Sequence, residues 1–101
     1  MKPDRTLSML GIAAKSGNVQ SGEFSTEKAV KCGQAKLVIV AEDASDNTKK
    51  KFENMCEFYH VPCKIYAPKE TLGHFIGKEY RASLAITNAG IADTILKQLN
   101  P

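Results

Sequence analysis

The stretch Leu37-Val38-Ile39-Val40-Ala41 decides the fold. It is short, continuous, apolar and rich in β-branched residues, which is typical of a strand that is covered on both faces. Helical patterns flank it over about 22–31, where Gly33 is placed to end the helix in a left-handed turn, and over about 45–59. The chain therefore predicts an α/β fold: a three-layer α-β-α sandwich with a small mixed sheet of about four strands, part of it parallel.

Shorter patterns complete the sheet and its helices. We expect a first helix over about 4–15 with Asp4 as its cap, a short helix over about 69–76 that Pro68 opens, and a last helix capped by Asn88. The other strands are expected over 18–21, 63–67 and 84–86, with 63–67 nearer an edge because its residues alternate in polarity. The buried stripe of the helix over 45–59 should hold Phe52, Met55, Cys56 and Tyr59.

Length and composition describe one ordinary globular domain over residues 1–101. Apolar residues make up 43% of the chain and charged residues 25%, which excludes a disordered polar chain. No apolar run approaches the ~18 residues of a membrane span, and Met1-Lys2-Pro3-Asp4 lacks the apolar stretch of a signal peptide. Three cysteines do not make a disulfide scaffold. We expect a cytoplasmic monomer.

The sequence contains no recognisable catalytic or cofactor motif. No GxGxxG pattern follows a strand, and the stretch Gly73-His74-Phe75-Ile76-Gly77-Lys78 has three residues between its glycines, where a phosphate-binding loop needs four. His74 is a lone histidine without a nucleophile in interpretable context. We expect no catalytic residues and no cofactor.

Two clusters of potential metal ligands are better explained by packing and capping. Cys56, His60 and Cys63 would supply three zinc ligands, where a closed structural site needs four. Cys56 also lies on an apolar stripe, which favours core packing. The acidic residues Glu42, Asp43 and Asp46 follow the central strand, where magnesium could bind, but a cap on the next helix from Asp43 or Ser45 is the simpler interpretation. We expect no metal.

A basic surface beside one helix start remains as the candidate site. The net charge is +3, which permits nucleic-acid binding. The start of the second helix, Gly22-Glu23-Phe24-Ser25-Thr26, offers backbone N–H groups that suit phosphate, and Ser25 and Thr26 could add hydroxyl hydrogen bonds. Lys28, about one turn on, could pair with a phosphate or a base edge. Sequence-independent attraction is expected from Lys15, Lys31 and Lys36.

Several linked segments are specific enough to indicate a family. They are Gly22-Glu23-Phe24-Ser25-Thr26-Glu27-Lys28-Ala29-Val30, the stretch from Gly33 to Asp43, Val61-Pro62, Leu72-Gly73 and Gly77-Lys78. Together they resemble the small ribosomal proteins of the L7Ae and L30e type, which bind kink-turn RNA, from about Leu7 to Leu99. The segments 21–23 and 42–48 are most similar to the bacterial YlxQ-type branch. The resemblance implies non-catalytic binding of structured RNA, ribosomal or ribosome-associated, with the ribosome or other translation proteins as further partners.

The resemblance also implies where the RNA binds. In the family, a glycine-led helix start enters the groove at the kink, an Asn-Glu pair reads guanines, a lysine one turn on supports them, and a loop before the last strand covers flipped-out bases. Gly22 and Lys28 match this pattern, but Phe24 and Ser25 stand at the Asn-Glu positions. The loop is Lys78-Glu79-Tyr80-Arg81-Ala82, where the family usually has small aliphatic residues.

These departures leave two hypotheses. In the first, Phe24, Tyr80 and Arg81 stack on exposed bases, and the helix start faces the loop before the last strand across one groove. The RNA site would then comprise Gly22, Glu23, Phe24, Ser25, Thr26 and Lys28, with Lys15, Lys31, Lys36, Tyr80 and Arg81. In the second, the chain is a protein-interaction module anchored by Phe24 and Tyr80. Packing of Phe24 beneath its helix is a third possibility for that residue alone.

Overall fold

The computed structural model describes residues 4–100 and leaves out residues 1–3 and 101. The prediction that no signal peptide begins at Met1-Lys2-Pro3 therefore concerns residues outside the described ones. Its elements, in order, are α1 (Arg5–Lys15), β1 (Val19–Ser21), α2 (Glu23–Lys31), β2 (Leu37–Val40), α3 (Asp46–Tyr59), β3 (Cys63–Ile65), α4 (Lys69–Phe75), β4 (Ser83–Ile86) and α5 (Ala89–Leu99). Each predicted helix and strand is present, with its ends within two residues of the expected ones.

The four strands form one mixed sheet in the order β1-β4-β2-β3. β2 runs parallel to β3, whereas β4 is antiparallel to both of its neighbours, β1 and β2. The central strands β2 and β4 are buried at every residue, which explains the uninterrupted apolar run at 37–40. β3 lies at an edge, as its alternation predicted.

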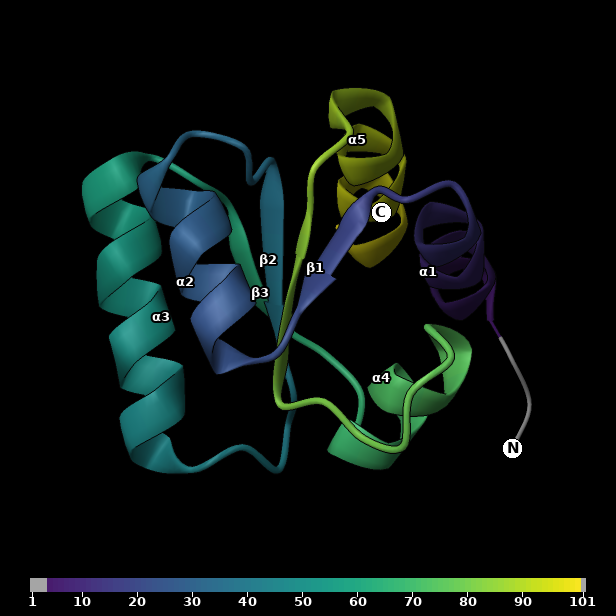
Figure 1. Ribbon diagram of the computed structural model, residues 1–101, viewed down its shortest axis with the longest axis horizontal. Helices are drawn as coiled ribbons and strands as arrows, with labels where there is room; N and C mark the ends of the chain where they lie inside the picture. The colour runs from purple at the N-terminus through teal and green to yellow at the C-terminus, as the bar shows by residue number, and fades with distance from the viewer. Residues whose placement is uncertain (1–3, 101) are drawn as a thin grey trace.

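Helices cover both faces of this sheet (Figure 1). α2 and α3 lie against one face, and α1 and α5 lie on the other, with α4 beside α1 near the end of the sheet where β4 begins. The core includes Leu10 and Leu72 from one helical layer and Val30 and Phe52 from the other, all fully buried. The three-layer α-β-α sandwich is therefore confirmed.

Side-chain caps begin three of the helices. The Asp4 carboxylate accepts a hydrogen bond from the Leu7 N–H at 2.8 Å, and the Asn88 side-chain oxygen accepts one from the Ile91 N–H at 2.9 Å, as predicted. Of the two candidates for α3, Ser45 is the cap, because its Oγ accepts from the Thr48 N–H at 3.1 Å. Asp43 instead accepts a hydrogen bond from the Lys69 N–H at 2.9 Å and so holds the start of α4.

The predicted buried stripe of α3 is wrong at its last residue. Phe52 and Cys56 are buried and Met55 is half-buried, but Tyr59 is 40% exposed. A helix of 14 residues spans about 21 Å, whereas a strand of four spans about 13 Å, so α3 is longer than the strand it covers. The exposure of Tyr59 indicates that the C-terminal end of α3 is the one that extends past the sheet. Tyr59 packs edge-on against the exposed ring of Phe58, with centroids 4.9 Å apart.

Candidate nucleic-acid interface

The start of α2 has no side-chain cap. Its N-cap residue is Gly22, with φ +95°, a conformation that side chains rarely adopt, and nothing lies within 4 Å of where a Cβ would stand. The carbonyl of Gly22 accepts the first helical hydrogen bond, from the Thr26 N–H at 2.9 Å. Among residues 4–100, no acceptor binds the N–H groups of Glu23, Phe24 and Ser25 in this first turn, which is the arrangement that suits an anion.

The loop before β4 lies beside this helix start. The guanidinium Nε of Arg81 donates to the hydroxyl of Ser21 at 3.2 Å, and the Gly22 N–H donates to the Ser83 carbonyl at 3.0 Å. These contacts join segments some 60 residues apart, because the antiparallel pairing of β1 with β4 brings the end of one strand to the start of the other. We call residues 21–25, Lys28, Tyr80 and Arg81 the helix-start surface.

Close contact with α4 fixes the loop. A Cβ on Gly73 would stand 2.4 Å from the Tyr80 Cα and 2.6 Å from its backbone nitrogen, so only glycine fits there. The Lys78 N–H donates to the Gly73 carbonyl at 2.8 Å, and the Arg81 N–H donates to the Lys69 carbonyl at 3.0 Å. The loop is thus held to α4 at both ends, and Tyr80 and Arg81 start from a fixed backbone.

Exposed aromatic and basic side chains stand on this surface. Phe24 is 79% exposed and Tyr80 is 60% exposed. The hypothesis that Phe24 packs beneath its helix is therefore wrong. Phe24 and Lys28 are four residues apart and share the outer face of α2, and Lys28 is exposed, with no ion pair among residues 4–100. Ser25 is half-buried, and Glu23 is exposed at the first helical position.

The predicted contact from the Thr26 hydroxyl is wrong. Thr26 is fully buried, and its Oγ1 has no hydrogen-bond partner among residues 4–100. The reason is the helical period, which places position 26 with Ala29 and Val30 on the face that packs on the sheet.

The structure does not bring the other predicted lysines to the helix-start surface. Lys36 donates its backbone N–H to Ile86, which ends β4, whereas Gly22 pairs with Ser83, which begins it. Lys31 lies at the far end of α2, where its ammonium contacts a Glu27 carboxylate oxygen at 2.8 Å. Lys15 ends α1, on the other face of the sheet. All three are exposed, but they are distributed over the molecule.

The groove expected between α2 and the loop does not coincide with the depression that lies beside the loop. The depression beside the loop opens toward α4 instead, and its lining includes Asp43, Glu70, Glu79 and Tyr80. Its acidic side chains disfavour phosphate. The helix-start surface therefore presents its groups outward.

An ion-pair cluster beside α2 was not predicted. The ammonium of Lys51, on α3, lies 2.7 Å from a Glu27 oxygen and 3.8 Å from a Glu23 oxygen. Hydrogen bonds from Lys31 and Lys51 lower the pKa of Glu27 to about 2, and the bond to Glu27 raises the pKa of Lys51. In the sequence, the run Lys49-Lys50-Lys51 is typical of a solvated helix face. The signal that one of these lysines forms an ion pair is the spacing of Glu23 and Glu27, which places two carboxylates four residues apart on one face of the preceding helix.

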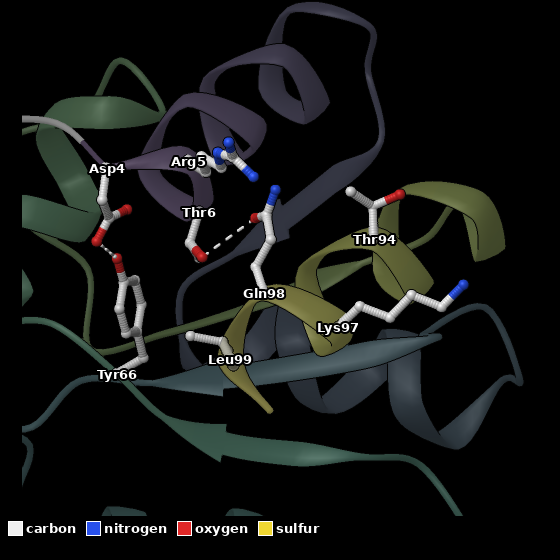
Figure 2. Close-up of a pocket in the computed structure, with 8 residues that line it drawn as sticks. All are labelled: Asp4, Arg5, Thr6, Tyr66, Thr94, Lys97, Gln98 and Leu99. Atoms are coloured by element: carbon white, nitrogen blue, oxygen red, sulfur yellow. Dashed lines mark hydrogen bonds between the residues drawn. The ribbon is translucent and has the colours of Figure 1, made fainter. Parts of the chain in front are cut away.

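A depression of about 620 Å³ lies at the seam of α1 and α5 (Figure 2). Its polar groups contact one another: the Tyr66 hydroxyl donates to the Asp4 carboxylate at 2.6 Å, and the Thr6 hydroxyl donates to the Gln98 side-chain oxygen at 3.2 Å. Burial and the bond to Asp4 raise the pKa of the Tyr66 hydroxyl. These hydrogen bonds hold α1 to α5 and to Tyr66, so these polar groups of the depression already have partners. The helix-start surface therefore stays the candidate site.

Neither predicted ligand cluster forms a metal site in the part of the chain that the structure describes, residues 4–100. No three His, Cys, Asp or Glu side chains converge there. Cys56 is buried in the core, and His60 is exposed in a left-handed turn after α3. None of the helices within these residues is both long enough and apolar enough to cross a membrane.

The chain is similar to known proteins over most of its length. The model of the ribosomal protein L7Ae/L30e/S12e/Gadd45 family matches residues 4–96. Proteins called RNA-binding protein YlxQ are similar over most of the chain: that of Bacillus subtilis (strain 168) is 40% identical, covering 91% of this chain and 92% of its own length, and that of Enterococcus faecium is 34% identical, covering 87% and 84%.

Two solved structures share the fold. A protein of unknown function from Bacillus halodurans C superposes with a TM-score of 0.95 at 34% identity, covering 98% of this chain and 100% of its own. A 15.5kD RNA binding protein of Giardia lamblia superposes with a TM-score of 0.81 at 22% identity, and the match covers 99% of this chain and 92% of that protein's chain. At this identity the likeness supports the fold alone. The family model and the YlxQ relatives confirm the resemblance noted in the sequence, and the chain belongs to the ribosomal protein L7Ae/L30e/S12e/Gadd45 family.

Proposed function

We propose that this protein binds structured RNA, ribosomal or ribosome-associated, without catalysis, as a cytoplasmic monomer. The observation that carries the proposal is the uncapped start of α2 beside the Arg81 loop, with Lys28 and the exposed Phe24 ring on the outer face of α2. Family membership and the RNA-binding names of the YlxQ relatives support it.

Each group on the surface has a role that follows from its chemistry. The N–H groups of the first turn of α2 hold a phosphate, and Gly22 leaves room for a sugar–phosphate backbone to approach. Lys28 pairs with a second phosphate or a base edge. Phe24 and Tyr80 stack on unpaired bases, and the Arg81 guanidinium, held by Ser21, adds a flat cationic face.

A standard kink-turn should be a weaker ligand for this chain than for relatives that carry the Asn-Glu pair. Ser25 has a short neutral side chain and Phe24 has no hydrogen-bonding group. Each lost base contact is worth about 1–3 kcal/mol, or roughly ten- to hundredfold in affinity. Stacking of bases on the exposed rings would contribute about 1–3 kcal/mol of binding free energy per base, and this contribution depends less on the RNA sequence.

A titration tests the proposal. Fluorescence anisotropy would compare a folded ribosomal RNA fragment that contains a kink-turn with a plain duplex of equal length, at two salt concentrations. We expect tighter binding to the folded fragment, and Lys28→Ala should lower the salt slope by about 0.9. Lys36→Ala is the matched control, since Lys36 is an exposed lysine at the opposite end of the sheet. Equal affinity for both RNAs, or equal losses for both variants, would contradict the proposal.

The exposure of Phe24 and Tyr80 also favours a second candidate function, a protein-interaction module on the same surface. The two functions are separated by affinity capture from cells. Partners that survive nuclease treatment and are lost with Phe24→Ala favour protein docking, whereas partners that disappear with nuclease favour RNA.

A further inference from the structure

One lysine of α3 reaches across to the two acidic residues at the start of α2. The Lys51 ammonium lies 2.7 Å from Glu27 and 3.8 Å from Glu23, and Glu27 also contacts Lys31 at 2.8 Å. The side chains of Lys51 and Glu27 are 38% and 29% exposed, so this pair is only partly solvated. Glu23 and Glu27 lie on the side of α2 that faces α3, and the outer face with Phe24 and Lys28 is adjacent to that side.

The two carboxylates stand where they would oppose an RNA ligand. Glu23 is the first residue of α2, beside the N–H groups proposed to hold a phosphate, and Glu27 precedes Lys28 directly. Because consecutive Cα atoms are only about 3.8 Å apart, the Glu27 carboxylate lies within the ~8 Å screening length of a phosphate bound beside Lys28 at physiological salt. Without a counter-charge, both would repel phosphate.

We propose that Lys51 is a positioning residue for RNA binding: together with Lys31 it offsets the charges of Glu23 and Glu27, and it holds their carboxylates toward α3, away from the face that carries Phe24 and Lys28. The inference rests on the proposed function. Lys51 contacts the acidic residues and not the RNA, so its role is to set the charge of the helix-start surface. The pKa of Glu27, lowered to about 2, keeps that carboxylate charged and paired over the whole physiological range.

A four-variant comparison tests this role, with the folded kink-turn fragment of ribosomal RNA as the probe. Lys51→Ala should weaken binding by about three- to tenfold, a size typical of one uncompensated charge near a surface. Lys50→Ala removes the same charge from an exposed position with no ion pair among residues 4–100, and should weaken binding less than twofold. Lys51→Arg should keep binding, and Lys51→Ala with Glu27→Gln should restore it to within about twofold of the parent protein.

Two further measurements separate positioning from contact. The salt slope should be nearly unchanged in Lys51→Ala, whereas the loss of a direct phosphate contact would lower it by about 0.7–0.9. The pKa of the Glu27 carboxyl, followed by NMR without RNA, should rise from about 2 toward its ordinary value in Lys51→Ala. A thermal melt checks that each variant folds. If Lys51→Ala does not fold, Lys51→Gln carries the test, because it keeps much of the side chain but removes its charge.

The outcomes that overturn the inference are distinct. A loss in Lys51→Ala that Glu27→Gln does not restore, together with a lower salt slope, makes Lys51 a phosphate ligand. Equal losses in Lys50→Ala and Lys51→Ala reduce the effect to net charge. Failure of the parent protein to bind the fragment would refute the proposed function itself, whereas failure of the inference leaves that binding intact.

Discussion

Gly73→Ala should destabilise the protein even though alanine is the better helix former. In a helix interior, Ala is favoured over Gly by about 0.5–1 kcal/mol. The added methyl group would, however, stand 2.4 Å from the Tyr80 Cα, 2.6 Å from the Tyr80 nitrogen and 2.8 Å from the Glu79 carbonyl carbon. All three are backbone atoms, so no side-chain rotation relieves the overlap, and the loop or α4 must move. Overpacking of this kind typically costs about 1–3 kcal/mol.

The net loss should be about 1–2 kcal/mol, which lowers the Tm of a domain of this size by roughly 5–15 °C. Circular dichroism melts measure the loss, and RNA titrations should show weaker binding because Tyr80 and Arg81 shift with the loop. Gly11→Ala is the matched control, because Gly11 is also helical and its added methyl would meet only the Phe75 carbonyl at 3.4 Å. A Gly73→Ala protein that melts at or above the parent temperature would refute the packing argument.

Four other substitutions test single contacts. Thr26→Val should stabilise the fold by about 1 kcal/mol, since it removes a buried hydroxyl without a partner; a denaturant titration that shows a loss would contradict this. Ser21→Ala should weaken RNA binding about fivefold, because it removes a hydrogen bond of about 1 kcal/mol to the Arg81 guanidinium, and Arg81→Lys should weaken it at least as much, because it also removes the flat cationic face; a smaller loss for Arg81→Lys than for Ser21→Ala in anisotropy titrations would contradict this. The carboxyl of Glu27 has its pKa lowered from 4.5 to about 2, so its stabilising contribution is complete above pH 4.5 and is lost as the pH falls through 2. Glu27→Gln should accordingly flatten the fall of Tm between these pH values, and an unchanged fall would place the acid sensitivity elsewhere.

The elements of the fold were predictable because their signals are local. A continuous β-branched run at 37–40 identifies a strand covered on both faces, and Asp4 and Asn88 mark helix starts through bonds to N–H groups three residues away. The same locality explains the error at Tyr59. The helical period assigns it to the apolar stripe, but its burial depends on where the neighbouring strand begins, which the helix sequence does not encode.

The candidate site was predictable in its centre and not in its extent. Gly22 and Lys28 belong to one helix, so their spacing in sequence fixes their spacing in space. Lys36 follows the same helix by only a few residues, yet it lies at the opposite end of the sheet because the chain has travelled the length of α2 before β2 begins. Lys51 is further along the sequence, but the packing of α3 on α2 brings it to Glu23 and Glu27. Charge counted along the chain therefore misplaces both residues.

The contrast between helix starts is the strongest physical argument for the location of the site. α1, α3 and α5 each begin with a capping side chain that satisfies an N–H group of the first turn, and at the start of α4, where Pro68 cannot cap, the Asp43 carboxylate accepts from the Lys69 N–H. α2 begins at Gly22, which costs only a few tenths of a kcal/mol relative to a capping side chain and leaves that position open. On the proposed function, a phosphate oxygen takes the place of the missing cap, so the same N–H groups are satisfied by water in the unbound protein and by RNA in the complex. The modest cost explains how a fold of marginal stability can retain an uncapped helix at its binding surface.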